Sequence, residues 1–261
     1  MTHEDFTQAL TRTYLQNPCQ VLPRPLWQML TELDGCETAI ASDQQGVNRL
    51  EAWTADSLML YWRRDNRQPS LLISRRLGYQ QTAMIHQDFL DAPTVAGFQH
   101  FQSQYRLMHR QQVVDAPELP AGFRFAGVVN STDEAQAMMA HIEQEKLSGM
   151  GDVQAWLDSP AFAADLWLWV VDEATDQPAG IAIAELDPQL REAAVRWVQV
   201  FPDYQGRGLG RALVQELLHR IGGRALFTTV TGIVEDRDNP GAFFRCCGFS
   251  GDDVWWYLSR A

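Results

Sequence analysis

The chain has 261 residues, which is long enough for two domains, and its 46% content of hydrophobic residues can fill their cores. Its formal net charge of −12 argues against general nucleic-acid binding, because that function needs a basic face for the phosphate backbone. The N-terminus has no apolar signal region, and no stretch approaches about 18 uninterrupted apolar residues. We therefore expect a cytoplasmic protein with no nucleic-acid and no membrane partner.

The cysteines and histidines show no metal-binding spacing. Cys19, Cys36, Cys246 and Cys247 contain no C-x-x-C pair, and the last two are adjacent. Adjacent cysteines rarely form a disulfide with each other or bind one metal with both thiols. We expect reduced thiols and no metal ion.

A segment with two prolines, residues 113–123, divides the chain and predicts domains at 1–117 and 118–261. The first domain is expected to be a small α+β domain that helps to shape the acceptor side of a site in the second. Its pattern predicts helices within residues 3–16 and 25–33, short strands at 49–55, 57–64 and 69–75, and an amphipathic helix at 94–110. No internal repeat is visible in the sequence.

The second domain is easier to read in chain order. A strand at 123–129 precedes a helix that opens with Ser131 and Glu134 in capping-box spacing, and a short helix follows at 152–162. Three strands are expected at 166–172, 180–187 and 193–201. A helix from Leu209 to Ile221, a strand at 225–234, a short helix from Pro240 to Gly248 and a strand at 253–260 complete the order. The predicted fold class is α+β with a mixed sheet.

A glycine-rich loop, YQGRGLGRAL, lies between the last of the three strands and the long helix. Glycines allow the backbone to approach a ligand, and the following helix directs free N–H groups at the loop. This arrangement predicts a phosphate site, with Arg207 and Arg211 as cationic helpers. A tight turn that needs glycine only for steric reasons is the alternative. The loop matches neither the Rossmann pattern nor the Walker pattern.

The loop fits the pattern Q/R-x-x-G-x-G/A through Gln205, Gly208 and Gly210. With the preceding V-x-P at Val200 and Pro202 and the later NPGAFFRCCGF, the chain resembles the GNAT superfamily of acetyl-CoA dependent N-acetyltransferases over roughly residues 121–261. The resemblance implies the GNAT fold, acetyl-CoA as the acetyl donor, and a small amine, a polyamine, an aminoglycoside-like compound or a protein N-terminus as the acceptor.

The resemblance also implies cofactor-binding residues. The pantetheine arm would pair with the backbone of the strand before the loop and contact Asn239, although Asn239 also reads as a helix N-cap. Phe244 occupies the following short helix. The full set is Val198, Val200, Gln205, Gly206, Arg207, Gly208, Leu209, Gly210, Arg211, Asn239 and Phe244.

Catalysis needs a base for the amine proton and a donor to the tetrahedral oxyanion. By family analogy the oxyanion donor is the N–H of Val198. Strict alternation would place Glu192, Ala194, Arg196 and Val198 on one side of the strand. Some relatives carry a catalytic glutamate where this chain has Ala194, so Glu185 and Glu192 are the candidate bases. A solvated or ion-paired acid at a strand end is the structural alternative for each.

The residue at the family's general-acid position differs from the family pattern. Many relatives have a tyrosine at Phe244, and phenylalanine has no proton to give. Either the thiolate leaves unaided, or Tyr257 or Cys247 serves as the donor, although a small buried cysteine is the ordinary reading of Cys247.

The sequence therefore predicts an N-acetyltransferase that works by direct attack of a primary amine. A catalytically weak sensor or interaction module that binds CoA or acetyl-CoA is the alternative, and a nucleotide-binding regulator is a third. The sequence leaves a homodimer open.

Overall fold

The computed structural model describes residues 3–65, 81–90, 97–110, 113–127, 131–140, 142, 153–236 and 240–260. By their contacts the residues form two compact units. The first unit contains residues 1–108, 231–245 and 250–261, and the second contains 109–230 and 246–249. The end of the chain thus groups with its beginning. The domain ranges 1–117 and 118–261 stay a prediction.

The second unit contains a sheet with strand order β10-β9-β8-β7-β6. Neighbouring strands are antiparallel, except that β9 and β10 run parallel. The elements follow the predicted order, and only the last residues of β10 belong to the first unit. Their bounds are β6 Phe123–Ala126, α6 Thr132–Met139, α8 Val153–Leu157, β7 Trp167–Asp172, β8 Gln177–Asp187, β9 Glu192–Val200, α9 Leu209–Ile221 and β10 Phe227–Ile233.

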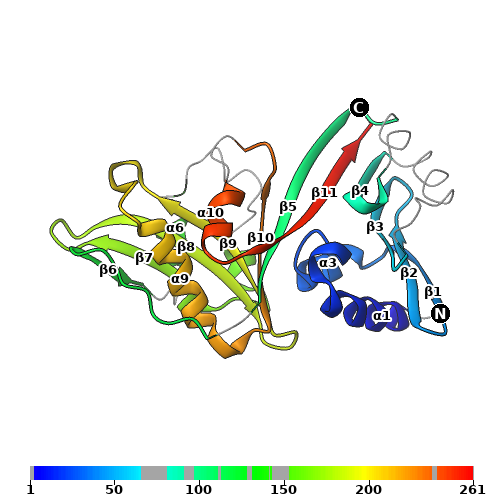
Figure 1. The fold of residues 1–261 in the computed structure, drawn as a ribbon, viewed down its shortest axis with the longest axis horizontal. Helices are drawn as coiled ribbons and strands as arrows, with labels where there is room; N and C mark the ends of the chain where they lie inside the picture. The colour runs from blue at the N-terminus through cyan, green and yellow to red at the C-terminus, as the bar shows by residue number, and fades with distance from the viewer. Residues whose placement is uncertain are drawn as a thin grey trace. The chain divides into compact units, whose positions relative to one another are not determined.

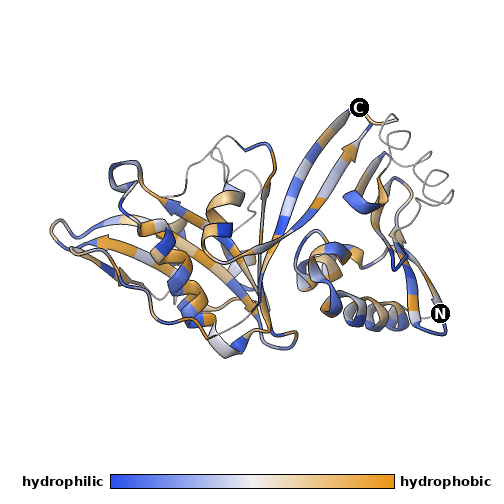
Figure 2. Cartoon of the chain, viewed as in Figure 1, coloured by the Kyte–Doolittle hydropathy of each residue, from blue (hydrophilic) through white to orange (hydrophobic). Residues whose placement is uncertain are grey.

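Helices cover both faces of this sheet. Ile181 and Ile183 pack with α6 and α8 in one apolar cluster, and α9 packs against β8 and β9 (Figure 1). The strands are largely apolar while α9 carries both apolar and polar residues, which is the pattern of a helix with one buried face (Figure 2). The predicted cap is present, since the Ser131 hydroxyl accepts a hydrogen bond from the Glu134 N–H at 3.2 Å. The predicted α+β fold class is confirmed.

A β-bulge interrupts the pairing of β8 with β9. Ile183 lies opposite Trp197 and Ala184 lies opposite Val195, so Arg196 is the extra residue. Because Ile183 and Ala184 face opposite sides, the bulge reverses the alternation along β9. The prediction that Val198 shares a side with Glu192 and Ala194 is therefore wrong.

The first unit contains a sheet with strand order β1-β2-β3-β4-β11-β5. The pairs are antiparallel except β3 with β4. Helices α1 and α2 pack on this sheet through β1, β2 and β11. The bounds are α1 His3–Gln16, α2 Pro18–Val21, α3 Leu26–Leu33, β1 Glu37–Asp43, β2 Gly46–Trp53, β3 Ser57–Arg63, β4 Thr82–His86, β5 His100–Arg110, α10 Pro240–Cys246 and β11 Ser250–Ser259.

One expected element of the first unit has the wrong type. Residues 94–110 were expected to form an amphipathic helix, but His100–Arg110 is strand β5, paired antiparallel with β11. The neighbouring residues Tyr105, Arg106 and Leu107 are all buried, so the strand is covered on both faces and lacks a period of two. The sequence also gave no signal for β1 and β4, and the strand expected at 69–75 lies outside the described residues.

Both units repeat one order of elements. Helices precede three antiparallel strands, and the fourth strand runs parallel to the third, in β1 to β4 and again in β7 to β10. This structural repeat has no counterpart in the sequence pattern. Across the described ranges, none of the helices is long and apolar enough to cross a membrane.

Candidate active site

The glycine loop connects β9 to α9 through a short 3₁₀ turn at Pro202–Tyr204. Gly206 has φ 75° and Gly208 has φ 83°, a left-handed conformation that favours glycine. A Cβ atom on Gly206 would meet nothing within 4 Å, and one on Gly208 would meet only Pro120 at 4.0 Å. Backbone conformation rather than crowding therefore accounts for these glycines, and the space beside them is open.

The N-terminus of α9 presents hydrogen-bond donors at this loop. The N–H of Ala212 makes a hydrogen bond of 3.1 Å to the carbonyl oxygen of Gly208. The N–H groups of Leu209, Gly210 and Arg211 precede that bond and have no partner within the helix. Together with the positive end of the helix dipole, these groups fit a phosphate.

Two side chains hold the loop in place. Gln205 donates from Nε2 to the Val200 carbonyl at 3.2 Å, and Arg207 donates to the Asp203 carbonyl at 3.1 Å. The Arg207 guanidinium also lies 5.4 Å from the ring centre of Tyr204 and 6.0 Å from that of Phe123. Sequence reasoning missed these two aromatic partners, because Phe123 lies on the distant strand β6.

Before the loop, the edge of β9 after Val195 is not paired with another strand among the described residues. Its parallel pairing with β10 ends at Val195 and Val230, while β9 continues to Val200. The Phe201 N–H donates to the Ala179 carbonyl at 3.0 Å, so alternation turns the peptide groups of Val200 and Val198 away from β8. An extended ligand could pair with this edge as an added strand.

Glu185 lies on the sheet face that α6 and α8 cover. It is directly opposite Ala194, and its side chain is only 6% exposed. Its Oε2 is 3.3 Å from Nε of Arg196, whose guanidinium lies 5.2 Å from the Trp156 ring centre. The sequence gave no signal for this contact, because it depends on the bulge that turns Arg196 toward Glu185.

The second candidate base is Glu192, at the first residue of β9. It lies opposite Asp187 on one side and Phe227 on the other, and it is fully buried. Glu185 and Glu192 thus come to the same face. Asp187 caps the turn between the strands, because its carboxylate accepts the N–H groups of Gln189 and Leu190.

The two candidate proton donors belong to different units, Tyr257 to the first and Cys247 to the second. Phe244, which has no proton to give, also belongs to the first unit. Phe244 is buried against Phe243, with ring centres 5.2 Å apart, while burial raises the pKa of Tyr257 and Arg24 partly opposes that shift. Burial raises the pKa of Cys247 to about 11, which makes it a poor proton donor near neutral pH. Asn239 lies outside the described residues.

No metal centre is seen in the described part of the chain, where no three His, Cys, Asp or Glu side chains gather. The second unit contains the other features of the candidate site. These are the open edge of β9, the glycine loop, the start of α9 and the sheet face that carries Glu185 and Glu192.

A family model described as acetyltransferase (GNAT) family matches residues 135–249. This range contains β7 to β10, α9 and α10. Among curated proteins, none matches the sequence significantly.

Solved structures resemble the chain over nearly its whole length. A GCN5-related N-acetyltransferase from Sphaerobacter thermophilus has 17% identity and a TM-score of 0.63, covering 97% of this chain and 90% of that one. A GNAT-family acetyltransferase from Colwellia psychrerythraea has 13% identity and a TM-score of 0.60, covering 100% and 98%. A tandem GNAT protein from the clavulanic acid biosynthesis pathway has 12% identity and a TM-score of 0.58, covering 98% and 95%. At these identities the likeness establishes the fold alone.

Proposed function

We propose, from the match of residues 135–249 to the acetyltransferase (GNAT) family model, that the protein transfers the acetyl group of acetyl-CoA to a primary amine. One observation gives the main support for the proposal. The open edge of β9 leads directly into a left-handed glycine turn and the free N-terminus of α9. A ligand with an extended arm and a pyrophosphate, such as acetyl-CoA, matches that sequence of features.

The donor would bind through backbone groups. Its pyrophosphate would accept hydrogen bonds from the N–H groups between Gln205 and Arg211, and its pantetheine arm would pair with the peptide groups of Val198 and Val200. Arg211 is exposed in the first turn of α9, within reach of an anion at the loop. Arg207 is already held by Asp203 and two rings, so its contribution would be to fix the loop as well as to add charge.

The reaction would be a direct attack. The amine nitrogen forms a bond to the acetyl carbonyl carbon, a carboxylate takes the ammonium proton, and the bond from carbon to sulfur breaks to release the CoA thiolate. The N–H of Val198 would stabilise the oxyanion of the tetrahedral intermediate.

Glu185 is the base that we favour. It lies directly across from Ala194, the position at which some relatives carry a catalytic glutamate, so the two side chains are neighbours on the same face of the sheet. Arg196 orients that carboxylate from one side and Trp156 supports Arg196. Glu192 is the second choice, because its side chain is completely buried.

The leaving group needs no donor in this proposal. A CoA thiol should resemble a cysteine, with a pKa of about 8.5, so the thiolate is a tolerable leaving group near neutral pH. Phe244 as a cofactor-binding residue stays a prediction. Tyr257 as a proton donor stays a prediction.

A CoA-binding sensor with little turnover is the alternative, motivated by Phe244 and Ala194. An assay that detects free thiol across a panel of amines separates the two functions. Turnover on any acceptor supports the transferase. Binding of acetyl-CoA without turnover on every acceptor tested supports the sensor.

We also infer that the first unit is a second copy of the same fold. Its strands repeat the order of the second unit, and one structural neighbour is described as a tandem GNAT protein. The crossover from β3 to β4, residues 64–81, has a single glycine in its sequence, Gly78, so the donor site is assigned to the second unit.

The experiment for the donor site compares two left-handed glycines, Gly208 and Gly35. Gly208→Val and Gly35→Val should each cost about 1–2 kcal/mol in stability, because both positions have positive φ and no close neighbour. Only Gly208→Val should weaken CoA binding, by at least about 100-fold in calorimetric titration. Unchanged CoA affinity in Gly208→Val would overturn the assignment.

A further inference from the structure

A cavity of about 500 Å³ lies in the first unit, at β3, β4 and β11 and beside α3. Its size falls within the range of roughly 300–1,000 Å³ that is typical of small-molecule sites. None of its lining residues belongs to the glycine loop, and the proposed acetyl transfer does not use it. Five side chains give it its chemical character: Arg24, Glu32, Met59, Met84 and Tyr257.

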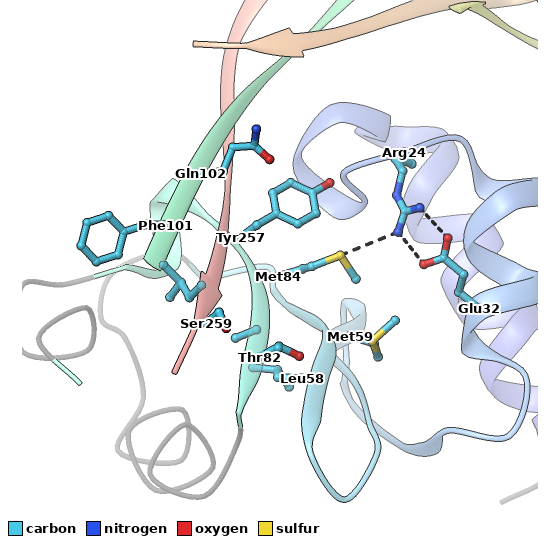
Figure 3. Close-up of a pocket in the computed structure, with 12 residues that line it drawn as sticks. Arg24, Glu32, Leu58, Met59, Thr82, Met84, Phe101, Gln102, Tyr257 and Ser259 are labelled. Carbon is cyan, nitrogen blue, oxygen red and sulfur yellow. Dashed lines mark hydrogen bonds and ion pairs between the residues drawn. The ribbon is translucent and has the colours of Figure 1, made fainter. Parts of the chain in front are cut away.

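The apolar part of the cavity comes from three strands. Met59 belongs to β3, Met84 to β4 and Tyr257 to β11, and Met84 and Tyr257 are direct partners across the sheet. Figure 3 shows these three side chains gathered with Arg24 and Glu32, while Phe101 points away from them. Methionine side chains are flexible and polarizable, so this surface suits an apolar group of adjustable shape such as an alkyl chain.

The polar part of the cavity is an ion pair. Arg24 donates from both terminal nitrogens to the two carboxylate oxygens of Glu32, each at 2.5 Å, and it also contacts the Met84 sulfur at 3.8 Å. The charges therefore compensate each other within the wall. An anion entering the cavity would meet Glu32, a cation would meet Arg24, and either would lose hydration without an unpaired counter-charge.

Hydrogen-bonding capacity remains after the ion pair is made. A carboxylate has about four lone-pair positions, so Glu32 can accept further donors. The Tyr257 hydroxyl makes a hydrogen bond with Arg24. Because a guanidinium has only donors, the hydroxyl oxygen accepts in that bond, and its own hydrogen can be donated to a ligand. One acceptor and one donor, beside an apolar floor, match the two ends of a carboxamide.

We propose that this cavity binds an uncharged amphipathic small molecule, an alkyl chain attached to a carboxamide. The chain would lie on Met59 and Met84, the carbonyl oxygen would accept from the Tyr257 hydroxyl, and the amide N–H would donate to Glu32. The proposed site does not need acetyl-CoA, so its test is separate from the test of acetyl transfer.

The test uses the full chain without acetyl-CoA and three probes of similar length. N-hexylacetamide is neutral, hexylamine is a cation and heptanoate is an anion. Calorimetric titration should show the neutral amide binding at least about tenfold more tightly than either charged probe. Tighter binding of a charged probe would overturn the ligand class, and absence of binding by all three would overturn the site.

Two variants test whether the amide binds in this cavity. Met59→Trp fills the cavity and should weaken the binding of N-hexylacetamide at least tenfold. Met108→Trp, at a half-buried methionine of β5 outside the cavity, should change this affinity by less than about twofold. Equal effects of the two tryptophans would contradict the assignment.

The second variant changes one atom. Tyr257→Phe keeps the ring and removes the hydroxyl. It should weaken the binding of N-hexylacetamide about three- to tenfold, while the apolar contacts of the alkyl chain stay intact. Thermal unfolding and CoA affinity, measured on each variant, show whether the chain is folded. An unchanged amide affinity in a folded Tyr257→Phe would remove the tyrosine from the site.

Discussion

The two units share an order of strands and differ in the segment that joins the third strand to the fourth. In the second unit this segment carries Gly206, Gly208 and the start of α9, where Arg211 is exposed. In the first unit the corresponding sequence has one glycine, and a cavity lies beside the strands instead. Our two proposals thus give one order of strands two uses, an anion site in the second unit and a largely apolar site in the first.

The units also bury charge for different purposes. In the first unit Arg106 is fully buried and donates to the carbonyl oxygens of Pro18 and Leu22 and to the Tyr14 hydroxyl. These bonds join β5 to the N-terminal helices. In the second unit the buried carboxyl groups of Glu185 and Glu192 lie on one strand face. The first arrangement ties a strand to helices, and the second is the one to which we assign chemistry in our proposal.

The largest expected effect tests the structural role of Arg106. Arg106→Met leaves three buried acceptors without their donor, so it should lower the free energy of unfolding by about 3–5 kcal/mol. Arg124→Met breaks only an exposed ion pair with Asp176 and should cost less than about 1 kcal/mol. Urea denaturation measures both. A folded Arg106→Met should still bind CoA, and loss of CoA binding by the folded variant would contradict the separation of roles.

Glu185 tests the chemical role of the second unit. Glu185→Gln should lower kcat by about 100-fold or more, because the amide cannot take the amine proton. Glu216→Gln is the matched control, since Glu216 is also buried and pairs with an arginine, Arg220, at 2.7 Å. Steady-state assays should find kcat of the control within about threefold of the parent chain. Equal losses in the two variants would assign Glu185 to stability alone.

The close packing of α9 on β8 gives a smaller expected effect. A Cβ atom on Gly180 would lie 2.7 Å from the Gln199 carbonyl oxygen and 3.3 Å from the Leu213 Cδ1. Gly180→Ala should therefore cost roughly 1–3 kcal/mol in denaturation experiments. Gly223→Ala, where a Cβ atom meets nothing within 4 Å, should be neutral or slightly stabilising. A neutral Gly180→Ala would show that the Gln199 carbonyl of β9 and the Leu213 side chain of α9 can both move aside.

The adjacent cysteines give the smallest effect, which concerns reactivity only. Cys246 is exposed, whereas Cys247 is buried with its pKa raised to about 11. At pH 8 only about one Cys247 in a thousand is a thiolate, so iodoacetamide should modify Cys246 first. The rate at Cys247 should rise with pH up to about 11. Mass spectrometry of partially alkylated protein locates the label, and preferential labelling of Cys247 at pH 8 would contradict its burial.

Much of the second unit could be predicted from local patterns. Periodicity and capping residues within about ten positions of each other predict helix α9, the Ser131 cap and strands β7 to β9. The glycine loop was recognisable for the same reason, since its conformation depends on its own residues. Strand β5 was misread as a helix, because its burial on both faces comes from partners that are remote in sequence.

The sequence by itself determined the order of elements in the family segment, the glycine loop and the two candidate carboxylates, all of which depend on neighbouring residues. Only the tertiary structure decided the repeated strand order, the cavity around Met59 and Met84, and the contact of Arg196 with Glu185. Each of these depends on strand register, and one extra residue at a bulge reverses which side chains meet. Register is set by pairing between distant segments, so it leaves no local pattern in the sequence.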